Sequence, residues 1–158
     1  MSAASKKDPK RFTEIRNPKA FHLYHVGERL ETGIMLRGTE MKSLRQGLAQ
    51  LADAFVRFEQ NAPVLHHAYI AEYAQGNIHN HEPRRPRKLL MNAREINKFK
   101  AAVEMQGMTV IPLRIYFKEG LAKIEVALCK GKNVADKRET LKRKTEQREA
   151  QRSMRAWK

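Results

Sequence analysis

The sequence predicts a mainly β fold with flanking helices, followed by a C-terminal tail that is disordered in isolation. Three observations support this prediction. Short β-type apolar runs alternate with turn signals between residues 12 and 131. One segment in that range has helical periodicity. The last 29 residues hold 11 Lys and Arg against 4 Asp and Glu, with few apolar side chains. An oligonucleotide-binding-like antiparallel β-barrel of about five or six short strands, with one or two packed helices, fits this order.

The chain is expected to divide into three segments. Residues 1–11 are polar and basic without periodicity, and we interpret them as a flexible basic leader. Residues 12–131 supply most of the large apolar side chains and form the folded barrel domain. Residues 132–158 form the basic tail. The total of 158 residues suits one core, since domains cluster at roughly 100 to 150 residues.

Strand signals recur in order along this domain. Extended runs are expected at residues 34–36, 55–58 and 64–70, each bounded by Gly, Asn or Pro. The clearest pair is residues 109–117 and 123–128, which a short turn ending in glycine separates. In the second run Ile, Val and Leu alternate with Lys, Glu and Ala. This pattern predicts a hairpin with one solvated face.

One helix is predicted between these strands. Asn92 is followed three residues later by Glu95, which resembles a capping box, and Gly107 is placed to end the helix. Helical spacing is kept by the apolar residues Ile96, Phe99 and Val103. We therefore expect one amphipathic helix to pack on the sheet.

The charge points to a polyanionic partner. The chain carries 32 Lys and Arg against 17 Asp and Glu, a net charge of +15. Such an excess repels itself and is typical of proteins that bind nucleic acid or an anionic membrane. A spanning helix needs about 20 apolar residues, and the first 20 residues here are polar, so composition alone predicts a cytosolic (cytoplasmic) or nuclear protein without a membrane segment. Cys129 is the only cysteine and is interpreted as a core thiol.

The sequence offers no catalytic, metal or cofactor motif, so we expect a protein that is not an enzyme. The histidines lack a cysteine partner and a His-Glu-x-x-His pattern, and no Walker loop or dinucleotide glycine fingerprint occurs. No spacing brings the acidic side chains together for acid-base chemistry. A hydrolase that uses His81 with a carboxylate remains the enzymatic alternative. The side chains considered for these roles are His66, His67, His79, His81, Glu31, Glu40 and Asp53.

The segment from Pro83 to Leu90 combines prolines with cations. The prolines hold an extended backbone, while Arg84, Arg85, Arg87 and Lys88 are available to a partner. We interpret the segment as phosphate-binding, and an exposed basic loop is the alternative.

The tail has the composition of a helix that cannot fold alone. Most of its residues are good helix formers, and Glu139 lies four residues before Arg143. Its apolar side chains are too few to offset roughly 1 to 2 kcal/mol of backbone entropy per residue. In a helix, Arg148, Arg152 and Arg155 would form a basic stripe beside an apolar face, which suits an RNA groove. A solvated tail without a specific site, or a calmodulin-type or membrane-surface helix, is the alternative.

Motifs in order from Asn17 to the tail resemble the SsrA-binding protein family, also called small protein B. The matching segments are Asn17-Pro18-Lys19-Ala20, residues 33–45, Gln75-Gly76-Asn77 with Asn80-His81, Arg87-Lys88-Leu89-Leu90, Tyr116-Phe117, and Lys130-Gly131-Lys132 leading to Asp136-Lys137-Arg138. The resemblance implies an RNA-binding barrel that takes the tRNA-like domain of transfer-messenger RNA to bacterial ribosomes stalled without a stop codon. This is trans-translation, which rescues the ribosome and tags the nascent peptide. A generic single-strand-binding barrel with stacking aromatics is the competing interpretation.

The resemblance also implies which residues meet transfer-messenger RNA. The family's RNA-binding face includes the matches to Asn17, Glu31 and Leu90. Asn17 would contact base edges or 2′-hydroxyls, Glu31 would accept from exocyclic amines, and Leu90 would pack on a base or ribose. Without the resemblance, Glu31 would be interpreted as a structural carboxylate and Leu90 as a core leucine. The predicted set is completed by Lys19, His22, Lys42, Arg45, Arg87 and Lys88.

For the tail, the resemblance implies a helix in the vacant mRNA channel and decoding centre of the small ribosomal subunit. It also implies an indirect association with elongation factor Tu through aminoacylated transfer-messenger RNA. Two departures stand out: Ala135 lies where many members have a stacking His, and Pro18 replaces a basic residue. The predicted ribosome-binding residues are Lys130, Lys132, Asp136, Lys137, Arg138, Lys142, Arg148, Arg152, Met154, Arg155 and Trp157.

Overall fold

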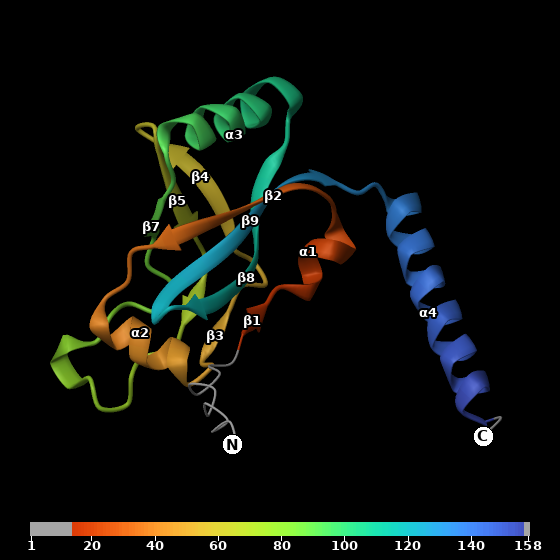
Figure 1. Ribbon diagram of the computed structural model, residues 1–158, viewed down its shortest axis with the longest axis horizontal. Helices are drawn as coiled ribbons and strands as arrows, with labels where there is room; N and C mark the ends of the chain where they lie inside the picture. The colour runs from red at the N-terminus through yellow and green to blue at the C-terminus, as the bar shows by residue number, and fades with distance from the viewer. Residues whose placement is uncertain (1–13, 157–158) are drawn as a thin grey trace, which may run out of the picture.

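The computed structural model describes residues 14–156, and its main element is an antiparallel sheet that closes into a ring (Figure 1). Seven strands follow the order β1-β8-β4-β5-β7-β2-β9, and β9 pairs again with β8, which closes the ring. β3 and β6 form a separate two-stranded sheet. The strands are β1 (Ile15–Arg16), β2 (Tyr24–Ile34), β3 (Ala49–Gln50), β4 (Phe55–Glu59), β5 (Ala62–His66), β6 (Tyr69–Ile70), β7 (Arg87–Leu90), β8 (Thr109–Lys118) and β9 (Leu121–Gly131). The predicted mainly β class with flanking helices is confirmed.

In the described part of the chain, four α-helices accompany this ring. α1 (Pro18–Leu23) and α2 (Gly38–Arg45) precede and follow the long strand β2. α3 (Ala93–Gln106) covers one end of the ring, and α4 (Val134–Ala156) extends away from it (Figure 1). A short 3-10 helix, η1 (Asn77–His79), lies in the loop before β7.

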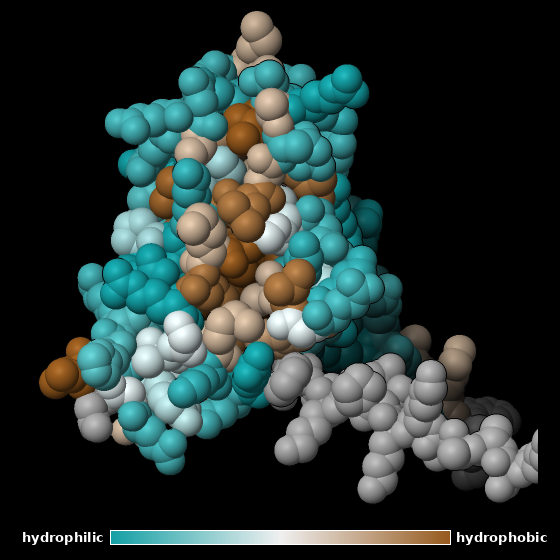
Figure 2. Space-filling model, turned by 60° about the vertical axis from the view of Figure 1, so that its left-hand side comes forward, coloured by the Kyte–Doolittle hydropathy of each residue, from teal (hydrophilic) through white to brown (hydrophobic). Residues whose placement is uncertain are grey.

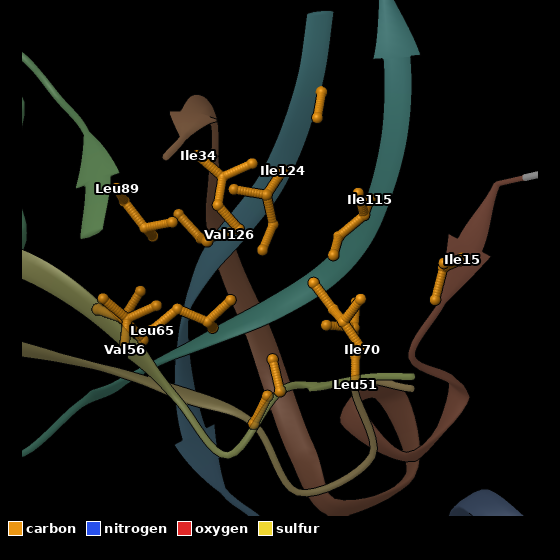
Figure 3. Close-up of a cluster of buried hydrophobic side chains, with 14 of the residues drawn as sticks. Ile15, Ile34, Leu51, Val56, Leu65, Ile70, Leu89, Ile115, Ile124 and Val126 are labelled. Carbon is orange, nitrogen blue, oxygen red and sulfur yellow. The ribbon is translucent and has the colours of Figure 1, made fainter. Parts of the chain in front are cut away.

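The core fills the inside of the ring with aliphatic side chains (Figure 3). Leu65, Val110, Ile124 and Val126 are fully buried and come from three of its strands. Phe99 closes one end from α3, because it is 1% exposed and belongs to the same cluster. Buried and more exposed residues alternate along β5 and along the parts of β8 and β9 next to their turn, so these parts have an inner apolar face and an outer solvated face. Farther from the turn both faces are buried, because Ile111, Leu113, Ala127 and Cys129 pack with Ala20 of α1.

The predicted hairpin and helix are both confirmed. β8 and β9 pair from Lys118 opposite Leu121, so the turn has two residues, Glu119 and Gly120, both with positive φ. A two-residue turn of this kind matches the twist of paired strands. In α3, the Asn92 side chain accepts from the backbone N–H of Glu95 at 3.0 Å, and Gly107 ends the helix at φ 62°. Both elements were predictable because their signals are local.

Other strand expectations need correction. The strand expected at residues 34–36 is wrong beyond Ile34, which is the last residue of the 11-residue strand β2. β2 was missed because its glycines and charged residues break the apolar alternation, and the register shifts between Val26 and Arg29. The run expected at residues 64–70 divides at His67, whose φ is 62°. α1 and α2 were missed because they have only 6 and 8 residues.

The tail forms the single helix α4 in the structure. Asn133 caps it by accepting from the backbone N–H of Asp136 at 2.8 Å. Every side chain from Leu141 to Ala156 is exposed. The helical form was expected, and disorder of the isolated tail stays a prediction. The leader, residues 1–11, and Trp157 lie outside the described residues.

Candidate nucleic-acid interface

Two rows of side chains cross the outer face of the sheet. In the first row Leu90, Gly33, Lys123 and Tyr116 lie opposite one another on β7, β2, β9 and β8. In the second row the same pairing joins Glu31 to Glu125 and Arg114, and continues to β1. The predicted contact residues Glu31 and Leu90 thus belong to one surface.

Glu31 is held by two neighbours. Its carboxylate accepts a hydrogen bond from the Tyr116 hydroxyl, and its Oε1 lies 3.5 Å from Nζ of Lys118. The Tyr116 hydrogen bond is the largest effect holding the pKa of Glu31 below its ordinary value. Burial, reinforced by Glu31, raises the pKa of Tyr116 well above its ordinary value, so the phenol stays protonated and donates.

Arg114 joins the two rows. Its guanidinium donates to Glu14 at 2.6 Å and to Glu125 at 3.0 Å, and it lies over the Tyr116 ring at 4.6 Å. These hydrogen bonds raise the pKa of Arg114, with the bond to Glu14 the largest cause. Arg29 contacts the second oxygen of Glu125 at 3.6 Å. The outer face is therefore fixed by ion pairs and a cation–π contact before any ligand binds.

Leu90 lies beside an apolar hollow. It is 57% exposed and packs over Gly33, where an added Cβ would come within 3.1 Å of it. The hollow has a volume of about 180 Å³ and is lined mainly by Ile34, Leu36, Met41, Leu90, Leu121 and Ala122, together with Lys123. Figure 2 turns the side of the molecule that carries β7 and α2 toward the reader and shows apolar side chains gathered at its centre.

Asn17 was expected to contact RNA, but in the structure its side chain is buried. Its side chain is 2% exposed, and its Nδ2 donates to the carbonyl of Pro112 at 2.9 Å. Its backbone N–H donates to the carbonyl of Leu113 at 2.8 Å. Its Oδ1 is buried and has no hydrogen-bond partner among residues 14–156. Asn17 therefore anchors the start of α1 to β8, while Lys19 on α1 is exposed and His22 is half-buried.

The predicted phosphate contact of Arg87 is wrong. Arg87 is 0% exposed, donates to Glu40 at 3.0 Å, and donates to the carbonyls of Ala68 and Pro83. Arg85 also pairs with Glu40, at 2.6 Å. Of the four cations between Pro83 and Leu90, Arg85 and Arg87 are therefore directed toward the buried Glu40 carboxylate. Lys88 is exposed, because it points to the opposite face of β7.

Two further predicted residues lie on α2. Lys42 is exposed and its ammonium lies 5.2 Å from the Tyr73 ring centroid, and Arg45 is also exposed. The predicted RNA-binding residues are therefore divided among the outer sheet face, α1, and the α2 region.

The first turns of the tail contact the barrel. Nζ of Lys132 donates to the carbonyl of Phe21 at 3.0 Å and to Thr140 at 2.9 Å. His25 lies 3.2 Å from Asp136. Lys137 is half-buried, and the exposed members of the predicted ribosome-binding set are Lys130, Arg138, Lys142, Arg148, Arg152, Met154 and Arg155.

His81 and Cys129, which the sequence analysis considered for chemistry, are both buried. His81 is 2% exposed, with its ring nitrogens within hydrogen-bond distance of Thr39 and the carbonyl of Ile70, so it is not open to a substrate. Burial raises the pKa of the Cys129 thiol to about 11, in keeping with a core thiol. Within residues 14–156, no group of three His, Cys, Asp or Glu side chains could hold a metal. No helix of this range is long and apolar enough to span a membrane.

Sequence reasoning did not single out Arg114, Tyr116, Lys118 and Lys123, which the structure places on the outer sheet face with Glu31. The signal was the alternation in the predicted hairpin, which assigns Lys123 and Glu125 to its solvated face. The partner strand supplies Arg114 and Tyr116 to that face.

A closed antiparallel sheet with a charged outer face and a basic helix beyond it defines a nucleic-acid-binding protein of the oligonucleotide-binding-like class. The model of the family described as SmpB protein matches residues 14–156, and the chain belongs to this family.

Relatives support this membership over most of the chain. The SsrA-binding protein of Streptomyces avermitilis is 48% identical over 150 residues, covering 95% of this chain and 85% of the relative. That of Carboxydothermus hydrogenoformans is 47% identical over 140 residues, covering 89% and 94%. A solved chain described as "tmRNA-SmpB: a journey to the center of the bacterial ribosome" matches with a TM-score of 0.65 and 43% identity, covering 77% of this chain and 85% of that one.

Proposed function

We propose that this protein binds the tRNA-like domain of transfer-messenger RNA and delivers it to stalled bacterial ribosomes for trans-translation. Relatives named SsrA-binding protein, which cover about nine tenths of the chain, support this proposal. So does the ribosomal setting of the solved structural relative. The protein acts by recognition, without catalysis or a cofactor, in the bacterial cytoplasm. Its link to elongation factor Tu is indirect, through aminoacylated transfer-messenger RNA.

The observation that carries the proposal is the contrast between a pre-formed outer face and an exposed basic helix. The face with Glu31 and Leu90 stands on the closed sheet, and Arg114 ties two of its strands to half-buried Glu14 and Glu125, which suits a folded RNA of fixed shape. α4 spans 23 residues and is exposed from Leu141 onward, which suits a channel walled by RNA. Two partners are thus assigned to two regions.

The site residues take these roles in the proposal. On the barrel, Glu31 and Leu90 belong to the RNA-binding face, Asn17 fixes α1, and Arg87 supports β7 from inside. On the tail, Asp136, Lys137 and Arg138 lie nearest the decoding centre and the later arginines meet ribosomal RNA. Further contacts come from Lys19, His22, Lys42, Arg45 and Lys88 on the barrel and from Lys130, Lys132, Lys142, Met154 and Trp157 at the tail.

A competition titration tests the barrel's part of the proposal. Fluorescently labelled tRNA-like domain is titrated with the full chain at several salt concentrations, against an unstructured RNA of equal length. We expect at least about tenfold tighter binding to the tRNA-like domain, and a slope of log K on log salt of about 0.7 to 0.9 per phosphate contacted. Equal affinity for the two RNAs at physiological salt would contradict the proposal.

A further inference from the structure

Glu31 is placed to organise its neighbours. Both of its oxygens are engaged, one by the Tyr116 hydroxyl and the other by Nζ of Lys118 at 3.5 Å. Lys123 acts on the same carboxylate through its charge. A carboxylate that already holds a phenol and an ammonium has less capacity left for an RNA amine.

The groups around Glu31 form a strip suited to one nucleotide. Tyr116 and Lys123 are cross-strand partners, and Lys118 and Leu121 are the next outer-face pair toward the turn. Leu90 continues the first row across Gly33. Leu121 is 60% exposed and lines the same hollow as Leu90. The strip therefore offers two ammonium groups beside an apolar hollow.

We propose that Tyr116, Lys118 and Lys123 contact the RNA directly, with Leu90 and Leu121, and that Glu31 is a positioning residue that acts through Tyr116 and Lys118. The ammonium groups meet a phosphate, and the hollow between Leu90 and Leu121 takes a ribose or base edge. The Tyr116 ring, backed by Arg114, sets the wall beside the phosphate. This inference rests on the proposed function and specifies the barrel surface that carries it.

Contacts at both ends of the Tyr116 side chain hold it in place within this strip. The guanidinium of Arg114 covers the ring at 4.6 Å, and Glu14 and Glu125 fix the guanidinium. Glu31 fixes the hydroxyl at the far end of the ring. Without either contact the Tyr116 side chain is freer to move, so ordering it on the RNA then costs more side-chain entropy.

A double-mutant cycle on the full chain tests the inference, with the tRNA-like domain as the probe. We expect Tyr116→Phe and Glu31→Ala each to weaken binding by about 5- to 10-fold, because each breaks the same charged hydrogen bond. The double variant should be little weaker than either single variant, since coupled residues are not additive. Glu31→Gln keeps an acceptor for the phenol, so it should stay within about 2-fold of the wild type.

The salt dependence provides a readout that a merely structural role would not change. Lys118→Ala and Lys123→Ala should each reduce the slope of log K on log salt by about 0.7 to 0.9. Lys98→Ala is the matched control, because it removes one exposed charge on α3 and breaks an exposed ion pair with Glu28. It should leave the slope unchanged. Thermal unfolding of each variant checks that the fold is retained.

Specific outcomes overturn the inference. If Tyr116→Phe binds like the wild type while Glu31→Ala weakens binding, Glu31 reads the RNA itself. If neither lysine variant changes the slope, the strip does not meet phosphate. Both results would leave the proposed function standing, provided that the wild-type chain still prefers the tRNA-like domain. Loss of that preference in the wild type would instead remove the proposed function.

Discussion

The barrel domain and α4 both contain glutamate–arginine ion pairs, but the pairs differ in burial and so in what they contribute to stability. In the barrel domain, Glu40 on α2 is 0% exposed and accepts hydrogen bonds from Arg85 at 2.6 Å and from Arg87 at 3.0 Å. In α4, Glu139 holds Arg143 at 2.7 Å with both side chains exposed. Removing one partner of a buried pair leaves an uncompensated charge, whereas an exposed pair exchanges its partner for water. A glutamate–arginine pair therefore fixes the shape of the barrel and does little to fix the tail.

This difference in burial explains how one chain can bind two RNA partners through two regions. The barrel carries its own core, so its outer face is ordered before binding. Between Leu141 and Ala156 the tail buries none of its side chains, so its order depends on what surrounds it. The following predictions test that contrast.

The largest expected effect comes from removing the tail. Deleting residues 132–158 should abolish peptide tagging on stalled ribosomes and change the affinity for the tRNA-like domain by no more than about 3-fold at physiological salt. Tagging is measured in a reconstituted translation reaction, and affinity by titration. The barrel should tolerate the deletion, because the hydrogen bond from Lys132 to the Phe21 carbonyl lies at its surface. Loss of binding by the truncated chain would show that the two regions do not act separately.

The second effect is on stability. Glu40→Ala leaves two arginines without their carboxylate, and Arg87 stays buried, so the free energy of unfolding should fall by about 3 to 5 kcal/mol. Urea denaturation measures the change. Glu139→Ala is the matched control in α4 and should change the same quantity by about 0.5 kcal/mol or less. Equal effects of the two substitutions would remove the contrast between the regions.

The sequence predicted the parts of the molecule that have local signals. The α3 cap joins residues three apart, and the β8–β9 turn has two residues. The Glu40–Arg87 pair spans 47 residues, so Arg87 was assigned to a partner's phosphate, although the fold supplies its partner. The Glu31–Tyr116 contact spans 85 residues. Composition gives charges, and the fold decides which of them face inward.

The third prediction concerns pH. Burial tends to raise the pKa of Glu40, but hydrogen bonds from Arg85 and the backbone of Arg37, with the charge of Arg87, hold it below its ordinary value of 4.5. A depressed pKa in the folded state gives stability that is present above the unfolded pKa and is lost as pH falls. The urea concentration at the unfolding midpoint of the barrel should therefore decrease as the pH is lowered from about 5 to about 3. In Glu40→Gln that fall should be smaller, and an equal fall would assign it to other carboxylates.

The smallest expected effect concerns the tail helix. A peptide of residues 132–158 should be less than about half helical by circular dichroism in dilute buffer, because its helix has few tertiary contacts to support it.

The substitution Ala150→Gly tests the same helix in the full-length chain. It makes the helical form less favourable by about 0.5 to 1 kcal/mol, which corresponds to about 2- to 5-fold weaker binding of the tail to the ribosome. Tagging at limiting protein concentration should fall by that factor, while the urea midpoint of the full-length chain stays unchanged. Ala150 is exposed, so the substitution removes no packing contact within this chain. If the peptide were already fully helical, glycine would act on the free tail as well as on the bound one. Unchanged tagging together with a helical peptide would mean that the tail brings its own order to the ribosome, and the contrast with the barrel would not hold.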